Sequence, residues 1–332
     1  MKKSKENYVW LGNVPVGIGA IIRGWDILEK DFKNPNTLSV VDFRAMTERC
    51  PLNCPACFTD KNKKTLTLVE IKRVISEIAE MGARGINFLG EGEPTIDEDF
   101  FEIVEFTSSL GIIPVVFSEG SAKLCDRDFA KRLMSSGASV VLKCDSLLSA
   151  SYQNWCVGGN NSYYYKRNEA LQTLIDEGFN KISSDGTTRL GFDMVISREN
   201  IKEAPETVRF CRKNNIWIIV AFYLTSGRSA KKDFDQNLFS TLVQKQEMRK
   251  SILKIDKEFG FEHKMWNNFA TFGCVERLQI FGDGRVSTCP GNEKIIGRIQ
   301  DYSIKELNQM ILSQFPAHNP SCFDGNCIYR EL

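Results

Sequence analysis

Three cysteines stand close together in the segment CPLNCPAC, residues 50–57. Three residues separate the first pair and two separate the second, so a single loop offers three thiolates. A tetrahedral metal site needs four ligands. The two histidines of the chain, His263 and His318, are far from this loop in the sequence. Two kinds of site fit: a zinc ion completed by a distant residue, or a [4Fe–4S] cluster with one iron left open.

The overall composition narrows the setting of this loop. The 332 residues include 11 cysteines, an odd number with clustered spacings, which favours metal ligation over disulfides. The net charge of +1 provides no field for nucleic acid or an anionic membrane. The N-terminus lacks the apolar stretch of a signal peptide, and the longest apolar run, residues 216–224, is shorter than the ~20 residues of a membrane span. We therefore expect a cytoplasmic protein with no nucleic-acid partner and no membrane partner.

Short apolar strands alternate with helices over residues 38–230. Strands are expected at residues 38–43, 86–89, 112–117, 139–143, 189–196 and 216–224. Such alternation implies parallel pairing through right-handed crossovers. A doubly wound sheet and an incomplete barrel share this pattern. In both, ligands bind at the carboxyl ends of the strands, and the cysteine loop directly follows the first one.

The rest of the chain has a different character. Residues 1–37 form an N-terminal extension, and residues 231–269 form a charged helical linker with one long helix over 234–260. Residues 270–332 are expected to form a small domain, with a β-hairpin at 278–290 that turns at Gly-Asp-Gly and a helix after it. This last region holds four more cysteines: Cys274, Cys289, Cys322 and Cys327.

The segment CPLNCPACF resembles the signature loop of radical S-adenosylmethionine (SAM) enzymes, and the resemblance covers about residues 38–230. It implies that Cys50, Cys54 and Cys57 hold a [4Fe–4S] cluster whose open iron binds the amino and carboxylate groups of SAM. One electron then cleaves SAM and yields a 5′-deoxyadenosyl radical. The resemblance also implies an α/β fold, a partial (β/α)6 TIM barrel, and an electron donor such as flavodoxin or ferredoxin.

Further motifs extend this resemblance to the binding of SAM. GEGEP, residues 90–94, is similar to the GGEP stretch of the family, in which the glutamate accepts from the amino group of SAM. The family has an aromatic residue where this chain has Ala56, so Phe58 is the substitute for contact with adenine. The residues implied in SAM binding are Gly92, Glu93, Ser118, Lys143, Phe58 and Arg228. Three of these assignments also have a plainer reading: GEGEP as a turn, Lys143 as a lysine at a strand end and Arg228 as a solvated loop residue.

The C-terminal cysteines resemble those of a twitch domain, the shortened form of the SPASM extension on many radical SAM enzymes. Four thiols imply one auxiliary [4Fe–4S] cluster, and a structural zinc ion is the alternative. Among the remaining cysteines, Cys125 and Cys211 are expected to be structural. Cys144 and Cys156 follow the fourth strand, so either thiol is a candidate hydrogen-atom donor to a substrate radical.

The implied reaction is hydrogen-atom abstraction from a C–H bond of the substrate. We expect a small polar substrate that is dehydrogenated or epimerised, because the sequence leaves little room for a leader-binding domain. The alternative is a peptide or protein maturase that installs a crosslink or oxidises a side chain. A non-enzymatic electron-transfer or sensor protein ranks last, because it leaves GEGEP and the barrel unexplained.

Overall fold

The computed structural model describes residues 21–25, 38, 40–223, 226–259, 277–288 and 294–314. In this part of the chain, nine strands form one sheet in the order β11-β10-β9-β2-β3-β4-β5-β7-β8. The strands are β2 (Val40–Arg44), β3 (Gly85–Phe88), β4 (Ile113–Ser118), β5 (Ser139–Lys143), β7 (Leu190–Ile196), β8 (Trp217–Phe222), β9 (Arg277–Phe281), β10 (Arg285–Ser287) and β11 (Gly297–Arg298). The six predicted strands are confirmed as β2, β3, β4, β5, β7 and β8, which lie parallel in chain order. The sheet stays open between β8 and β11, as in a partial barrel.

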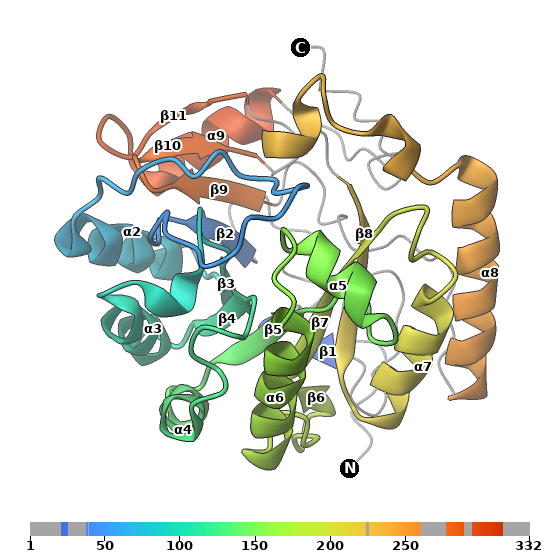
Figure 1. Ribbon diagram of the computed structural model, residues 1–332. Coiled ribbons are helices and arrows are strands. Elements are labelled where there is room, and N and C mark those ends of the chain that lie inside the picture. Colours follow the sequence, from blue (N-terminus) through green and yellow to red (C-terminus); the bar gives the residue numbers. More distant parts are fainter. Residues whose placement is uncertain are drawn as a thin grey trace.

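Helices follow the strands in an arc around the outer face of the sheet, and α5 lies inside this arc in the view of Figure 1. They are α2 (Leu68–Glu80), α3 (Phe100–Ser109), α4 (Arg127–Ser135), α5 (Ala150–Cys156), α6 (Tyr163–Asp176), α7 (Ala204–Lys213), α8 (Leu242–Glu258) and α9 (Ile304–Gln314). The capping box predicted for α2 is present: Glu70 N donates to Thr67 Oγ1 at 3.3 Å, and Thr67 N donates to Glu70 Oε2 at 2.8 Å. The single helix predicted over residues 234–260 is shorter, because a second capping box at Thr241 and Gln244 starts α8 only there.

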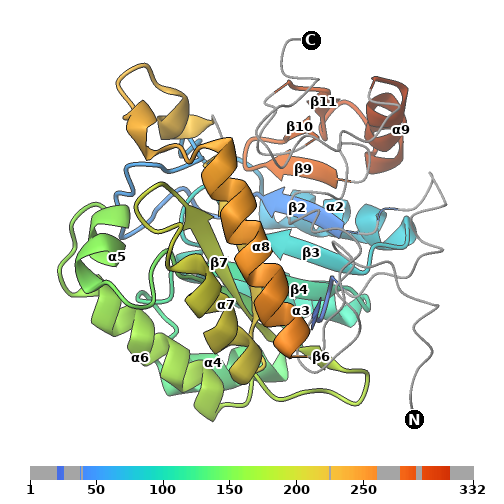
Figure 2. The ribbon, with the colours of Figure 1, turned by 90° about the vertical axis from the view of Figure 1, so that its right-hand side faces the viewer.

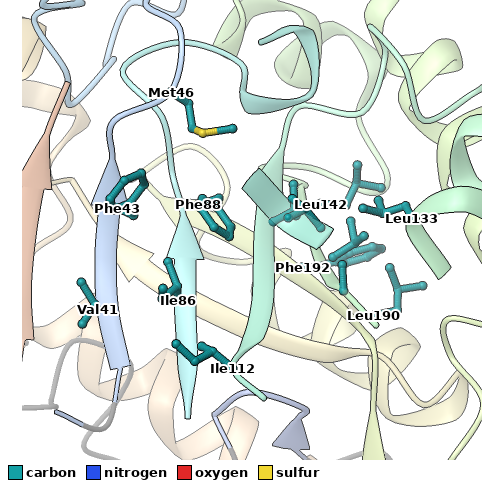
Figure 3. Packing of buried hydrophobic residues seen from close by; sticks show 14 of the residues in the cluster. Val41, Phe43, Met46, Ile86, Phe88, Ile112, Leu133, Leu142, Leu190 and Phe192 are labelled. Carbon is teal, nitrogen blue, oxygen red and sulfur yellow. The ribbon is translucent and has the colours of Figure 1, made fainter. Parts of the chain in front are cut away.

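The larger hydrophobic core lies between the sheet and these helices. Alternate residues of each strand contribute to it, as the two-residue period of a strand requires. Figure 3 shows Phe43, Phe88 and Leu142 among the side chains of this layer. The rings of Phe43 and Phe88 meet edge to face, with centroids 5.7 Å apart.

A second, smaller core fills the inner face of the curved sheet. It contains Trp25, Val115, Val141 and Trp217, and β1 (Ile21–Ile22) brings Ile22 into it by pairing with β6 (Thr187–Thr188). The indole of Trp25 is 2% exposed and donates to Asn87 Oδ1 at 2.7 Å. This apolar plug fills the inner face near the amino ends of the strands.

The predicted C-terminal hairpin is confirmed as β9 and β10, which are antiparallel. Strand β9 also pairs in parallel with β2 along all five of its residues, so the hairpin extends the sheet of the barrel. In Figure 2, β9 lies beside β2, and α9 packs against α2. The domain boundaries proposed above stay a prediction. Among the described helices, none combines the length and apolar character that crossing a membrane requires.

The inner plug provides a test of this architecture. We expect Trp25→Ala to lower the free energy of unfolding by about 3–5 kcal/mol, because it opens a cavity and removes the indole donor to the side-chain oxygen of Asn87. Chemical denaturation measures this loss. Trp155→Ala is the matched control, since Trp155 is 41% exposed and should change stability by no more than about 0.5 kcal/mol. Equal losses for the two variants would contradict the assignment of Trp25 to the core.

Candidate active site

The cysteine loop lies at the carboxyl end of β2 and rests on residues from α5 and α6. Cys50 and Cys54 are half-buried and pack against Leu52, Val157 and Tyr163. The loop turns where Cys57 N donates to Cys54 O at 3.2 Å. Burial raises the pKa of Cys50 to about 12 and also raises that of Cys54. Such thiols stay protonated at neutral pH unless a metal displaces the proton.

A segment after β8 fixes the backbone of this loop. Arg228 N donates to Cys57 O at 2.8 Å, and Arg228 Nη1 donates to Cys54 O at 2.9 Å. Gly227 has a φ of +54°, and a Cβ at this position would collide with the carbonyl of Cys57. The structure therefore gives Arg228 a defined task in holding the loop, which is more than a solvated arginine would do.

The GEGEP loop approaches the cysteine loop from β3. Gly92 N donates to Thr47 O at 2.9 Å, and Glu93 N donates to Arg49 O at 2.8 Å. A side chain at position 92 would collide with the backbone of Arg49. Glycine is therefore required here for the contact between the two loops, a reason that the sequence comparison with GGEP did not provide.

Glu93 is almost fully buried and is oriented by its neighbours. Its Oε1 accepts from Thr95 Oγ1 at 2.6 Å and from Ser118 Oγ at 2.7 Å, and its Oε2 accepts from Glu119 N at 2.9 Å. Burial raises the pKa of the Glu93 carboxyl to about 7, and the nearby Glu119 carboxylate adds to this shift. The structure places Ser118 as the support of Glu93. Among the described residues, Oε2 accepts from Glu119 N alone, so it retains capacity for one more donor.

Charged residues line the inner face at the end of β5 and at the middle of β7. Lys143 Nζ lies 2.7 Å from Asp145 Oδ2, and Lys143 pairs in register with Asp193. Burial opposes the charge of Lys143, yet Asp145 and the other nearby anions raise the pKa of its ammonium. Burial raises the pKa of Asp193 to about 6, against the lowering effect of Lys143. Asp193 was missed from the sequence, although an acid inside the apolar run LGFDMVI was a usable signal.

The structure separates the two candidate hydrogen donors. Cys144 follows Val140 and Leu142 on the face of β5 that meets the helices, and it lies in the outer core. Cys156 lies on α5, near the charged side chains of Lys143 and Asp145; we call these two residues and Asp193 the inner charges. Burial raises its pKa, Asp145 adds to the rise, and Tyr152 and Lys143 lower it. This placement speaks against a donor role for Cys144 and leaves Cys156 as the candidate.

Other predicted site residues have different neighbours. The guanidinium Cζ of Arg44 lies 5.3 Å from the centroid of the Phe58 ring, so Phe58 covers Arg44. Cys274, Cys289, Cys322 and Cys327 lie outside the described residues. Within the described ranges, no three Cys, His, Asp or Glu side chains already stand as a metal-ligand group. The three loop cysteines nevertheless fit a cluster in number, in donor type and in their shared loop, whose backbone is fixed from two sides.

An open parallel sheet with a three-cysteine loop at its carboxyl edge defines the class of a radical SAM enzyme. The family model of the Radical SAM superfamily matches residues 45–211, about half of the chain, and the chain belongs to this superfamily. The superfamily implies a [4Fe–4S] cluster and SAM.

Individual relatives are similar to parts of this chain. A PqqA peptide cyclase of Bradyrhizobium diazoefficiens is 38% identical over 96 residues, which cover 28% of this chain and 24% of that protein. The mycofactocin maturase MftC of Mycolicibacterium smegmatis is 24% identical over 246 residues, which cover 73% of this chain and 59% of that protein. The matches thus span less than two thirds of these curated relatives.

Solved structures support the fold. Streptococcus suis SuiB bound to its precursor peptide SuiA has a TM-score of 0.62 at 15% sequence identity, over 82% of this chain and 64% of that chain. The likeness confirms the partial barrel.

The raised pKa of Glu93 gives SAM binding a pH dependence. We expect the affinity for SAM to rise about tenfold between about pH 6 and about pH 8, because the ionised fraction of a carboxyl with a pKa of about 7 rises by that factor. The ionised carboxylate is the better acceptor for the amino group of SAM. Titration calorimetry on reconstituted protein measures the affinity.

Two variants control this experiment. Glu119→Gln removes the neighbouring charge and should move the midpoint to lower pH, whereas Glu93→Gln should flatten the profile. If wild type and Glu93→Gln show the same profile, Glu93 does not bind SAM.

Proposed function

We propose that this radical SAM enzyme modifies a peptide or protein substrate, by installing a crosslink or by oxidising a side chain. The similarity to the mycofactocin maturase, which extends over 73% of this chain, carries the proposal. The likeness to SuiB, a protein whose structure is known with a bound precursor peptide, agrees with it. These relatives favour a peptide substrate over the small polar substrate expected from the sequence.

In this proposal, Cys50, Cys54 and Cys57 hold the SAM-binding cluster. When bound, the cluster supplies the electron for reductive cleavage of SAM. Glu93 accepts a hydrogen bond from the amino group of SAM, and Ser118 keeps its carboxylate in place at 2.7 Å. Arg228 holds the loop at the carbonyls of Cys54 and Cys57. The electron comes from a donor such as flavodoxin or ferredoxin.

In this proposal, the substrate meets the radical beside Lys143, Asp145 and Asp193. Lys143 and Asp145 form an ion pair there and can orient the carboxylate of SAM or a polar group of the substrate. A peptide is a suitable substrate for such a site, because its backbone offers both donors and acceptors.

Cys156 supports a second candidate function, epimerisation. Its thiol lies beside Tyr152 and the inner charges, where it could return a hydrogen atom to a substrate radical. In that reaction the substrate regains a hydrogen atom and undergoes no net oxidation. The Cys156 thiol becomes a thiyl radical, which an electron from the flavodoxin or ferredoxin donor and a proton from solvent return to the thiol.

We also propose that Cys274, Cys289, Cys322 and Cys327 hold an auxiliary [4Fe–4S] cluster in a twitch-like domain. The proposal rests on the number of these cysteines and on the hairpin β9–β10, which ends at Ser287, two residues before Cys289. A fully ligated cluster there would accept the electron that a substrate radical loses on oxidation.

The substrate class can be tested with reduced, reconstituted protein, SAM and the peptides encoded by neighbouring genes. We expect one peptide to become two mass units lighter for each 5′-deoxyadenosine formed, because abstraction of a hydrogen atom is followed by loss of an electron and a proton. Mass spectrometry and chromatography measure both products. A peptide whose mass is unchanged in H2O but which gains one deuterium in D2O would support epimerisation. The Cys156→Ala variant should then fail to introduce this deuterium. Turnover of small metabolites with every peptide inert would refute the proposal.

The cluster assignments can be tested by iron analysis. Wild-type protein should bind about eight irons if both clusters are cubanes. Replacing Cys50, Cys54 and Cys57 with alanine together should halve the iron and abolish reductive cleavage of SAM. Replacing Cys322 and Cys327 is the matched control, which should keep a SAM-responsive EPR signal. Four irons and one zinc in the wild type would contradict the auxiliary cluster.

A further inference from the structure

A buried ion pair lies beside the residues that follow Cys57 and has no part in the function described so far. Arg44 Nη2 is 2.6 Å from Glu91 Oε1, and the two side chains are 2% and 0% exposed. Arg44 is the last residue of β2, and Glu91 is the second residue of GEGEP. Burying two charges is costly unless further hydrogen bonds hold them in place. The contacts of this pair therefore indicate what it does.

Glu91 connects the pair to the third cysteine. Thr59 Oγ1 donates to Glu91 O at 2.8 Å, and Asn62 N donates to Glu91 Oε2 at 3.1 Å. The same Thr59 hydroxyl lies 3.4 Å from Cys57 Sγ. Glu91 thus holds the chain just after Cys57 at two points, through its backbone and through its carboxylate.

Arg44 connects the pair to two aromatic rings. Its Cζ lies 5.3 Å from the ring centroid of Phe58 and 4.5 Å from that of Phe281, the last residue of β9. The next carbonyl, that of Gly282, accepts from Thr65 N at 2.9 Å and from Leu66 N at 3.1 Å. The end of the cysteine loop is therefore fastened to the β9–β10 hairpin as well as to GEGEP.

We propose that Arg44 and Glu91 are positioning residues for Cys57 and that their charges set how readily the cluster on the loop gains an electron. Together the two charges cancel. Removing one of them changes the net charge close to the loop, in a medium of low dielectric constant. Removal of the anion favours reduction of the cluster, and removal of the cation opposes it. This inference rests on the assignment of the cluster to Cys50, Cys54 and Cys57, and it does not depend on the substrate.

The test is a redox titration of the SAM-responsive EPR signal in reconstituted protein. The variants are Glu91→Gln, which keeps an acceptor for Asn62, Arg44→Met, and the double variant. The response to SAM identifies the correct cluster even when an auxiliary cluster is present. Chelator-induced loss of iron at this cluster gives a second measurement, which reports how firmly Cys57 is held.

The chain contains a matched control pair. Arg212 Nε lies 2.7 Å from Asp256 Oδ1, with side chains 4% and 0% exposed, between α7 and α8. Arg212→Met and Asp256→Asn also remove one partner of a buried pair and should lower stability in a similar way. They should leave the midpoint potential and the rate of iron loss unchanged.

We expect opposite shifts from the two single variants. Glu91→Gln should make the midpoint less negative, Arg44→Met should make it more negative, and the double variant should return toward the wild-type value. Arg44→Met should also lose iron several-fold faster than wild type. If Arg44→Met does not fold, Glu91→Gln and the double variant still decide the outcome.

Shifts in the same direction, or equal iron loss from Arg212→Met, would overturn the proposal, because a general loss of stability would explain both. A wild-type protein with a SAM-responsive cluster that modifies no peptide would refute the proposed function and leave this inference intact.

Discussion

The close approach of three loop backbones is the constraint on which the candidate site depends. The cysteine loop accepts backbone hydrogen bonds from Gly92 and Glu93 on one side and from Arg228 on the other. These contacts require a residue without a side chain at position 92 and again at position 227. Because the bonds involve peptide groups, they fix the path of the chain and leave the cysteine side chains available to a ligand.

Stability and chemistry occupy opposite ends of the same inner face. Toward the amino ends of the strands, tryptophans and aliphatic residues pack around Trp25. Toward the carboxyl ends, Lys143 and Asp193 pair in register on neighbouring strands. Every second side chain of a strand points to the inner face. Two successive residues on that face can therefore belong to the apolar plug and to the candidate site. The carboxyl edge can hold buried charges, because the burial of the apolar layers offsets the free-energy cost of desolvating those charges.

The sequence predicted the local features well, because short-range physics decides them. The six strands followed from apolar runs, and the start of α2 from Thr67 and Glu70. The side of the sheet on which Cys144 lies also follows from a local pattern, because Cys144 continues the alternation of Val140 and Leu142 on the helix-facing side. The pairing of β9 with β2 and the bond from Arg228 to Cys54 join residues far apart in the chain, and no local pattern predicts them. The short α5 has too few turns for its periodicity to be recognised.

The place of β9 also has a consequence for how the protein is made. Strand β2 pairs with β3 on one side and with β9 on the other, and about 230 residues separate Arg44 from Arg277. At synthesis rates of ~5–20 residues per second, about 10 to 50 seconds pass between the emergence of the two strands from the ribosome. Throughout that interval the nascent barrel exposes an unpaired edge next to the cysteine loop, and such edges invite pairing with other chains. The loop can reach its final surroundings only after β9 has emerged, and truncation before residue 277 would leave a barrel with an edge open to aggregation.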